Sequence, residues 1–469
     1  MKARNYIGLM IVTSLLLSGC QATPDQDIVA NKNDQQTEQS KAESAAESTE
    51  DTDAEKVVSE GYSESFASDS GDVTINIQVD QVKARPIPVM QAEAQDISVD
   101  DVKRWSKAFF GTTEDVYEGT SQMTKSEIQK AILWRQQRIN DKDRLITEEG
   151  YTEEAAEAVI QSYQEEIDNL KANYESAPED DERQKTDWTF HPFSYWMKDE
   201  MDGDDEDYSK EDRTQSLKVM GDYEGRGAHI SANNRQDADY QVHDMSFVLN
   251  DEVDINYNAD PVISREEAIQ MTSEKLKDLT DKEWQVDSAD NNGNQWRIKY
   301  VPVINNLPCL LTDLSYDSTD AYAANLTYEM LEFEIIDDQI TSVGWDSPME
   351  ITSTDSRPAE MLPFDDIYTA FKNYMQVKCT MTSLGMASDD EMEDETTAET
   401  EKVCANVNDI RQMYCRVKVK NSDQAFEYVP VYVFSGYASQ GDYKEDWWVN
   451  HFCVVNATDG TIINTWLGY

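Results

Sequence analysis

Hydrophobic and polar residues alternate strictly between Val73 and Val79. A period of two sends alternate side chains to opposite faces of an extended chain, so this pattern predicts a half-buried β-strand. Two prolines follow, Pro86 and Pro88, and proline is tolerated only at a sheet edge or in an irregular segment. The sequence therefore predicts that the folded part of the chain begins with a strand near residue 73.

Apolar residues then recur at steps of three and four, which predicts three helices. Each begins at a hydroxyl residue that can accept a hydrogen bond from the helix backbone: Ser98, Thr124 and Thr152. Asp101 and Glu127 stand three residues after the first two caps and complete capping boxes. We expect the helices to cover about residues 98–111, 124–140 and 152–174.

The third of these helices carries a continuous apolar stripe. Such a stripe packs against a neighbour, so we expect the second and third helices to form an αα-hairpin. A face that binds a partner protein is the alternative. Antiparallel strands separated by polar loops are expected between residues 187 and 250. The stripe consists of Ala156, Val159, Tyr163, Ile167, Leu170 and Tyr174.

The second half of the chain contains a repeated pattern. The tetrapeptide Tyr-Val-Pro-Val occupies residues 300–303 and again residues 428–431. Each copy follows a predicted helix, and each precedes two apolar strands that are joined by a turn and end in tryptophan. The first helix begins with a capping box of Ser264 and Glu267, and the second begins near Pro363. A helix laid on an antiparallel sheet, present twice, is the simplest fold for this pattern.

Together these patterns predict the α+β class. Residues 71–255 are expected to hold an N-terminal strand, the αα-hairpin section and antiparallel strands. A first helix-on-antiparallel-sheet repeat follows at 256–355, and a second at 356–469. The acidic segment 381–403 interrupts the second repeat; we expect a solvated loop there, with cation binding as the alternative.

The first twenty residues add a prediction of export. A basic start precedes an apolar segment from Ile7 to Leu17, which is shorter than the roughly 20 residues of a membrane span. Residues 1–19 are therefore expected to be a signal peptide. Leu17, Ser18, Gly19 and Cys20 together resemble the lipobox of bacterial lipoproteins. This resemblance implies cleavage before Cys20, lipidation of its thiol, and a lipid-anchored position on the extracellular side of the cell membrane, with the envelope type left open.

Composition narrows the choice of partners. The chain has 40 Lys and Arg against 94 Asp and Glu, a net charge of −54. Nucleic acids and anionic lipid surfaces bind clustered cations, so neither is expected as the main partner. Residues 21–60 contain no aromatic residue and are rich in small, polar and acidic ones. We therefore expect residues 20–70 to form a disordered acidic stalk.

Five cysteines follow Cys20, and export permits them to form disulfides. An odd number leaves at least one thiol without an intramolecular partner. The candidate pairs are Cys379 with Cys404, at the ends of the acidic insertion, and Cys415 with Cys453, in two predicted strands. No Cys-x-x-Cys spacing is present, so no metal and no cofactor are expected.

The sequence contains no recognised catalytic arrangement. The four histidines form no His-Glu-x-x-His, and we find no Gly-x-Ser-x-Gly, Ser-x-x-Lys or Walker motif. His451 and Cys453 lie two residues apart, on one face of a predicted strand, which leaves a thiol hydrolase as an alternative. The favoured interpretation is a histidine beside a buried cysteine, so we predict no catalytic residue and no enzymatic activity.

The segment 262–268 reads Val-Ile-Ser-Arg-Glu-Glu-Ala, and a Val-Pro-Val strand and an acidic hairpin turn follow it. This combination resembles the PepSY-type domains of bacterial exported proteins. The paired arrangement of the repeats is also similar to envelope lipoproteins that regulate cell-wall sensor kinases. The whole chain resembles Gram-positive surface lipoproteins with PepSY-like C-terminal repeats. The resemblance implies a non-catalytic module that binds or regulates a protein partner in the envelope. The alternative is glycan or solute binding at an exposed aromatic patch of Trp188 and Trp196.

Overall fold

The structure is a computed structural model of the whole chain. It describes the following residues: 55–119, 123–147, 152–192, 214–235, 243–250, 255–311, 328–354, 359–384, 403–419, 425–440 and 443–465. The predicted signal peptide, Cys20, Trp196 and most of the acidic insertion lie outside these ranges.

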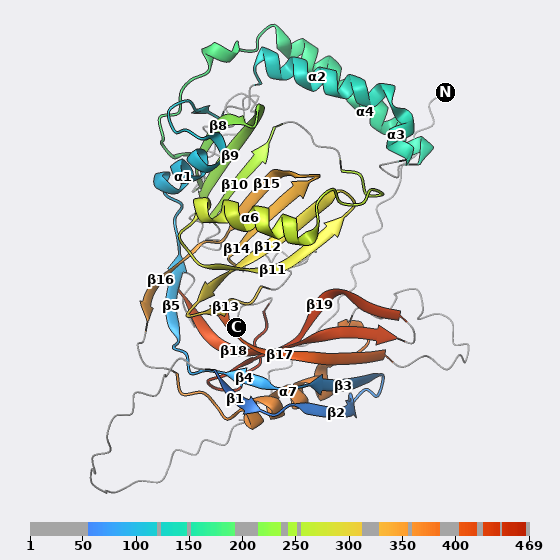
Figure 1. The fold of residues 1–469 in the computed structure, drawn as a ribbon, viewed down its shortest axis with the longest axis vertical. Helices are drawn as coiled ribbons and strands as arrows, with labels where there is room; N and C mark the ends of the chain where they lie inside the picture. Colours follow the sequence, from blue (N-terminus) through green and yellow to red (C-terminus); the bar gives the residue numbers. More distant parts are fainter. Residues whose placement is uncertain are drawn as a thin grey trace, which may run out of the picture. The chain divides into compact units, whose positions relative to one another are not determined.

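One large antiparallel sheet, here called sheet I, has the strand order β11-β12-β14-β15-β10-β9-β8-β6. Short strands β13 and β7 pair with β12 and β8. Helices α1 (Val99–Phe110) and α6 (Arg265–Leu279) lie over one face of sheet I (Figure 1). The strands of sheet I are β6 (Tyr117–Glu118), β7 (His191–Pro192), β8 (Thr214–Tyr223), β9 (Arg226–Arg235), β10 (His243–Leu249), β11 (Trp284–Asn292), β12 (Gln295–Ile304), β13 (Leu307–Pro308), β14 (Met330–Ile336) and β15 (Gln339–Asp346).

Local sequence signals explain where α1 begins and ends. Ser98 and Asp101 form the predicted capping box, and Gly111 ends the helix in the left-handed conformation with φ 71°. Trp105 and Phe109 are buried against sheet I, and the ring of Phe109 stacks on Phe247 at 3.8 Å. The predicted first helix is thereby confirmed.

A second sheet, sheet II, has the order β16-β5-β18-β17-β3-β2, and β19 also pairs with β18. Helix α7 (Phe364–Lys378) packs on it through Phe371, whose ring stacks on Phe434 at 4.0 Å. Strand β3 pairs with β17 in parallel, whereas the other strand pairs of sheet II are antiparallel. The strands of sheet II are β2 (Tyr62–Ala67), β3 (Val73–Val79), β5 (Met90–Ala94), β16 (Met349–Thr354), β17 (Val403–Lys418), β18 (Ala425–Gln440) and β19 (Tyr443–Asn456).

Regular structure begins before residue 73, which corrects the predicted end of the stalk at residue 70. Strand β1 (Lys56–Ser59) pairs with β4 (Val82–Ala84), and β2 pairs with β3. In β2 the aromatic residues Tyr62 and Phe66 lie on one face and pack against the core under α7. The acidic composition of the surrounding segment concealed this short alternating pattern.

The sheets also cross the predicted domain boundaries. In sheet I, β10 pairs with β15, so Met245 lies opposite Trp345 across the boundary predicted at 255/256. In sheet II, β3 and β5 pair with β17 and β18, which were predicted to belong to a different domain. The hydrophobic pattern along the chain does not show which distant strands pair with each other. The domain boundaries predicted from that pattern are therefore wrong. The mixed α+β class with mostly antiparallel sheets is confirmed.

Within the described residues, α6 is followed along the chain by β11–β16, and α7 is followed by β17–β19. Helix α1 is followed by β6, by the helices between residues 125 and 174, and then by β7–β10. The predicted final strand of the second repeat is reduced to an isolated bridge between Val455 and Ile462.

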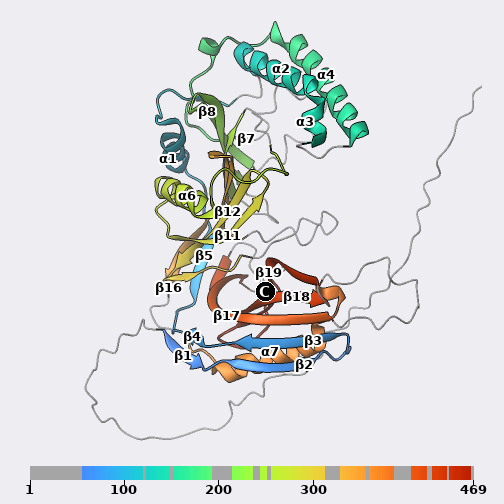
Figure 2. The same cartoon turned by 45° about the vertical axis from the view of Figure 1, so that its right-hand side comes forward.

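The residues inserted between α1 and β8 form a helical arm. It consists of α2 (Lys125–Asn140), α3 (Lys142–Thr147) and α4 (Glu153–Tyr174). Helices α2 and α4 lie side by side in both views (Figures 1 and 2). Trp134 meets Tyr163 edge-on at 5.5 Å, and Arg135 Nε lies 2.7 Å from Glu166 Oε2. The predicted αα-hairpin is therefore confirmed.

Candidate functional site

A cavity of about 720 Å³ lies between α2 and the strands β8–β10 of sheet I. Helix α4 contributes one side chain to it, and the segment after β6 contributes backbone. Cavities of this size are in the range that binds small molecules. The lining residues are Gly119, Met123, Glu127, Lys130, Ala131, Leu133, Trp134, Arg135, Gln137, Leu170, Lys218, Met220, Arg226, His229, Leu249 and Asn250.

The alternation of β8 and β9 builds the floor of the pocket. Val219 and Ile230, a cross-strand pair, are fully buried in the core under α1. Their neighbours Met220 and His229 pair with each other and point to the opposite face, toward the arm. The two faces of this part of sheet I thus have different roles, one as core and one as pocket floor.

Gly119 brings the chain close to this floor. Its backbone N–H donates to Lys218 O at 2.9 Å. A Cβ atom at Gly119 would lie 2.7 Å from Lys218 Cβ, which is closer than side chains approach one another. Glycine is therefore required where the chain leaves β6 and enters the arm.

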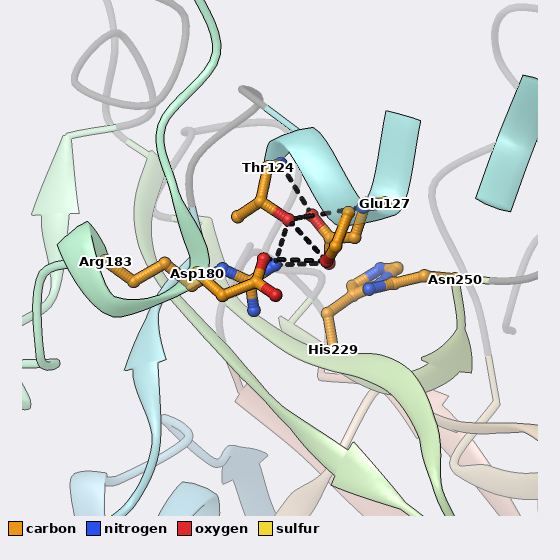
Figure 3. Close-up of polar contacts among 7 residues, drawn as sticks. Thr124, Glu127, Asp180, Arg183, His229 and Asn250 are labelled. Carbon is orange, nitrogen blue, oxygen red and sulfur yellow. Dashed lines mark hydrogen bonds and ion pairs between the residues drawn. The ribbon is translucent and has the colours of Figure 1, made fainter. Parts of the chain in front are cut away.

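A polar cluster at the base of the arm fixes α2 over the floor (Figure 3). Thr124 N donates to Glu127 Oε2 at 2.9 Å, and Glu127 N donates to Thr124 Oγ1 at 3.3 Å, which completes the predicted capping box. Glu127 also forms an ion pair with Arg183, and both side chains are more than four-fifths buried. The first turn of α2 is thereby tied to the segment that follows α4.

Asp180 belongs to the same cluster. Ser126 Oγ donates to Asp180 Oδ1 at 2.7 Å. Hydrogen bonds from the Thr124 and Ser126 side chains hold the pKa of the Asp180 carboxyl below its usual value. The chain entering the arm also pairs directly with the chain leaving it, because Glu118 N donates to Gln184 O at 2.8 Å. The arm therefore has a closed base.

The pocket is rich in cations although the chain is strongly acidic. Among the described residues, its lining includes four cations and one carboxylate, Glu127, which is itself paired with Arg183. Arg135 forms an ion pair with Glu166, and Arg226 Nη1 donates to the amide oxygen of Gln339 at 2.8 Å. The cations are Lys130, Arg135, Lys218 and Arg226.

Hydrogen-bonding and apolar groups complete the lining. His229 Nδ1 lies 2.7 Å from Asn250 Oδ1, and both residues lie beneath the first turn of α2 (Figure 3). Met123 and Leu133, two large apolar side chains, are 37% and 56% exposed. The pocket thus offers donors and apolar surface together, which suits binding. Among the described residues, no cysteine or serine lines the pocket, and no cluster of histidine, cysteine and carboxylate side chains could hold a metal ion.

Both predicted disulfides are absent, since Cys379, Cys415 and Cys453 are free and buried. Cys415 lies opposite Val429, and Cys453 lies opposite Phe434, five residues further along β18. An odd separation places the two thiols on opposite faces of sheet II, far outside bonding distance. Two strands were correctly predicted for these cysteines, but the register of those strands was not visible in the sequence.

The pair Cys379–Cys404 fails for a similar reason. Cys379 lies at the end of α7 and belongs to the core between α7 and sheet II. Cys404 stands between Val403 and Ala405, which both face that core. Alternation along β17 therefore turns Cys404 to the other face of the sheet.

His451 and Cys453 do not share a face, which corrects the arrangement behind the hydrolase alternative. A β-bulge between Phe434 and Ser435 shifts the register, so Cys453 pairs with Phe434 and His451 pairs with Ser435. His451 Nδ1 lies 2.9 Å from Ser435 Oγ. Burial raises the pKa of the Cys453 thiol far above its usual value, so the thiol is neutral and unsuited to nucleophilic attack.

The predicted aromatic patch is described only at Trp188. Its ring is half-buried against the core of sheet I, and Lys103 Nζ lies 5.3 Å from the ring centroid. Trp188 does not line the pocket, and Trp196 lies outside the described residues. The lipobox residues 17–20 also lie outside them.

The pocket was not predicted from the sequence. Of its lining residues only Glu127, as a helix cap, and Leu170, as part of an apolar stripe, stood out in the sequence pattern. The sequence of α2 carries a usable signal, because this helix has four basic residues and one acidic residue, Glu127, in an otherwise acidic chain. The basic residues are Lys125, Lys130, Arg135 and Arg138. A basic helix in an acidic protein points to a local site for negative charge.

Comparisons with known proteins identify no family. No family model and no curated protein match the chain. An uncharacterized protein from Eubacterium rectale ATCC 33656 is similar in structure, with 13% identity and a TM-score of 0.30 over 53% of this chain and 76% of that one. The YpeB C-terminal domain from Bacillus megaterium has 10% identity and a TM-score of 0.25 over 54% and 89% of the two chains. At these TM-scores the likenesses carry no argument, and the resemblance to PepSY-type domains stays a prediction.

No helix in the described part of the chain combines the length and the apolar character needed to cross a membrane.

Proposed function

We propose that this chain is a non-catalytic binding protein that holds a small ligand in the pocket between α2 and strands β8–β10. The observation that carries the proposal is the cavity of about 720 Å³, into which polar donors and exposed apolar side chains converge. The pocket lies between α2 and the strands β8–β10, and the base of the arm is closed. A ligand bound there would contact both the arm and the sheet and would therefore stabilise the position of the arm.

Binding of an uncharged apolar probe tests this proposal. The full-length chain is titrated with N-phenyl-1-naphthylamine, whose fluorescence rises in an apolar site, and saturable binding is expected. Met220→Trp fills the floor of the pocket and should weaken binding about tenfold or more. Ile351→Trp, on the exposed face of β16 in sheet II, is the matched control and should bind as the parent does. Absence of saturable binding, or undiminished binding by a folded Met220→Trp variant, contradicts the proposal.

We further propose that the chain is displayed on the extracellular side of the cell membrane through a lipid on Cys20. The lipobox-like residues 17–20 and the short apolar segment before them support this. Cys20→Ser should abolish incorporation of labelled palmitate and release the protein from the membrane fraction. Retention of label and of membrane association in that variant would count against the anchor.

A protein partner in the envelope is the second candidate function. It is supported by the apolar side chains of Tyr257 and Val262, which precede α6 and are 53% and 64% exposed. We interpret the two segments that begin at α6 and α7 as PepSY-like modules, supported by the helix and the following antiparallel strands in each. Crosslinking in intact cells should capture a partner with the parent chain and lose it with Tyr257→Ser and Val262→Ser combined. Equal capture by that variant argues against this surface.

A further inference from the structure

We propose that the ligand of the pocket is a small apolar molecule with a hydroxyl group, and that His229 accepts the hydrogen bond which that hydroxyl donates. This inference rests on the proposed binding function and names the chemical class of the ligand. Two observations carry it: the contact between His229 and Asn250, and the apolar side chains that line the cavity along α2.

The contact with Asn250 fixes which nitrogen of His229 carries the hydrogen. His229 Nδ1 lies 2.7 Å from Asn250 Oδ1, and an amide oxygen can only accept a hydrogen bond. Nδ1 must therefore carry the hydrogen, and in a neutral imidazole the other nitrogen, Nε2, is then an acceptor. The imidazole consequently presents a lone pair, and not an N–H, at Nε2.

The orientation of the Asn250 amide agrees with its surroundings. A Cβ atom at Gly227 would lie 3.3 Å from Asn250 Nδ2 and 3.6 Å from Glu127 Oε1. The amide nitrogen thus lies on the side of the carboxylate. A rotated amide would place its oxygen there, and the two oxygens would repel each other. The observed orientation therefore leaves the amide oxygen to accept from His229.

The acceptor at Nε2 is available to a ligand. Among the described residues, no group forms a hydrogen bond or an ion pair with it, and His229 lines the cavity (Figure 3). His229 stands on the middle strand of the floor, where it pairs with Met220 on β8 and Val248 on β10. A ligand that displaces water from this apolar neighbourhood leaves Nε2 without a partner unless it brings a donor of its own, and an unmade hydrogen bond costs free energy.

A hydroxyl suits this position better than an ammonium group does. An ammonium ion that is removed from water needs a carboxylate partner. Glu127 is the carboxylate of the described lining, and it already forms an ion pair with Arg183. A hydroxyl donates one hydrogen bond and carries no charge, so the lone pair at Nε2 satisfies it.

The apolar side chains define the rest of the ligand. Leu133 and Trp134 lie on α2 beyond Glu127, and seven residues of helix separate Glu127 from Trp134, which is about 10 Å along the axis. Leu133 is 56% exposed, so a ligand that covered it would remove apolar surface from water. An elongated apolar body that runs along α2 from a hydroxyl at His229 fits these positions.

Competition between two isomers tests the hydroxyl. Decanol and nonyl methyl ether have the same composition, but only the alcohol can donate a hydrogen bond. Each displaces N-phenyl-1-naphthylamine from the full-length chain at pH 8.5, below the concentration at which it aggregates. We expect the parent chain to bind decanol about three- to tenfold more tightly than the ether. Decylammonium should bind more weakly than decanol.

Two variants connect this preference to His229. His229→Asn keeps an N–H donor near the position of Nδ1 and has no atom in place of Nε2, so the two isomers should then bind equally. Asn250→Leu removes the oxygen that holds the hydrogen on Nδ1, which lets the hydrogen move to Nε2, and the preference should be lost again. His191→Asn removes a histidine of β7 that does not line the pocket, and it should bind as the parent does.

The tautomer of His229 is a readout that depends on neither variant folding. In the parent chain with nitrogen-15 histidine, NMR correlations within the imidazole should place the hydrogen on Nδ1 at pH 8.5. Loss of the signal in His229→Asn, or its shift in Asn250→Leu, assigns it. A hydrogen on Nε2 in the parent chain overturns the proposal.

The outcomes keep the two proposals apart. Probe binding with equal affinities for the alcohol and the ether in the parent chain overturns the hydroxyl ligand and leaves the binding function standing. Tighter binding of decylammonium than of decanol, or an undiminished preference for the alcohol in a folded His229→Asn variant, also overturns it. Failure of the probe to bind at all overturns both proposals.

Discussion

At the scale of single residues, Asp346 shows how the sheet changes the chemistry of a side chain. It lies on β15 directly opposite Asp244 on β10. Burial, and then the charges of Asp244 and Glu332, raise the pKa of Asp346 to about 6. The folded protein therefore holds this proton more tightly than the unfolded chain does. The resulting stabilisation is complete below the unfolded pKa near 3.8 and is lost as the pH rises through about 6.

Replacing Asp346 by asparagine should remove this pH dependence. We expect Asp346→Asn to increase the free energy of unfolding by roughly 1–3 kcal/mol at pH 7.5, and to have little effect at pH 4. Urea unfolding at the two pH values measures the difference. Asp338→Asn, in the exposed turn between β14 and β15, is the control and should leave the free energy of unfolding unchanged at both pH values. An equal increase in the free energy of unfolding at pH 4 and pH 7.5 would show that the effect is not electrostatic.

Thr124 has two roles at the base of the arm, as the cap of α2 and as a neighbour of Arg183. It is fully buried, and Arg183 Nη2 lies 3.5 Å from its hydroxyl. Thr124→Ala should therefore cost about 1–2 kcal/mol and speed hydrogen exchange in the first turn of α2. Thr124→Ser keeps the hydroxyl and should retain most of the protection. Similar exchange rates in the two variants would argue that the cap does not hold the arm.

At the scale of elements, helices were more predictable than sheets. The caps at Ser98, Thr124, Thr152 and Ser264 lie where the sequence placed them, because a cap depends on residues three positions apart. Strand partners can lie hundreds of positions apart, as β3 and β17 do. The bulge in β19 separates His451 from Cys453, and nothing in the local sequence announces it.

The same reasoning applies to the candidate site. Its floor requires Met220 beside His229, a pairing set by the β8–β9 register, and its roof requires α2 to fold back over that floor. The sequence predicted α2 and its cap correctly, but it could not show what α2 covers. The cluster of basic residues in α2 was the one feature of the local sequence that indicated the site.

Buried thiols give an element-level test of sheet II. Burial raises the pKa of Cys415 to about 12, so at pH 8 its ionisation alone should slow alkylation by iodoacetamide about 10³-fold relative to an exposed cysteine. Cys453 should be similarly protected, whereas the half-buried Cys404 should react faster. Urea should make all of them reactive. Peptide mapping that finds Cys415 joined to Cys453 would contradict the observed register.

At the scale of the whole molecule, each sheet combines early and late segments of the chain. A fragment of residues 256–469, cut at the predicted domain boundary, would lack β10 from sheet I and β3 and β5 from sheet II. We expect it to show no cooperative unfolding transition and to expose apolar surface to dyes. Cooperative unfolding of this fragment, like that of the full chain, would contradict the shared sheets.

Removing the arm provides the matched comparison. Its two ends already lie side by side, since Glu118 N donates to Gln184 O at 2.8 Å, so a short Gly-Ser turn can replace residues 119–183. This deletion should preserve cooperative unfolding and abolish binding of N-phenyl-1-naphthylamine. Loss of both properties would show that the arm is part of the folding unit and not only a wall of the pocket.

The parallel pairing of β3 with β17 has a consequence for the synthesis of the protein on the ribosome. Asn76 on β3 donates to Asn406 on β17, a partner 330 residues later in the chain. At about 5–20 residues per second, the ribosome needs roughly 15–65 s to add that many residues. During this time β3 can pair with β2 along one edge, but the edge that β17 will occupy has no partner strand and must be kept from other chains. Strand β3 is thus made early, yet its pairing with β17 forms only late in synthesis, and sheet II cannot close before then.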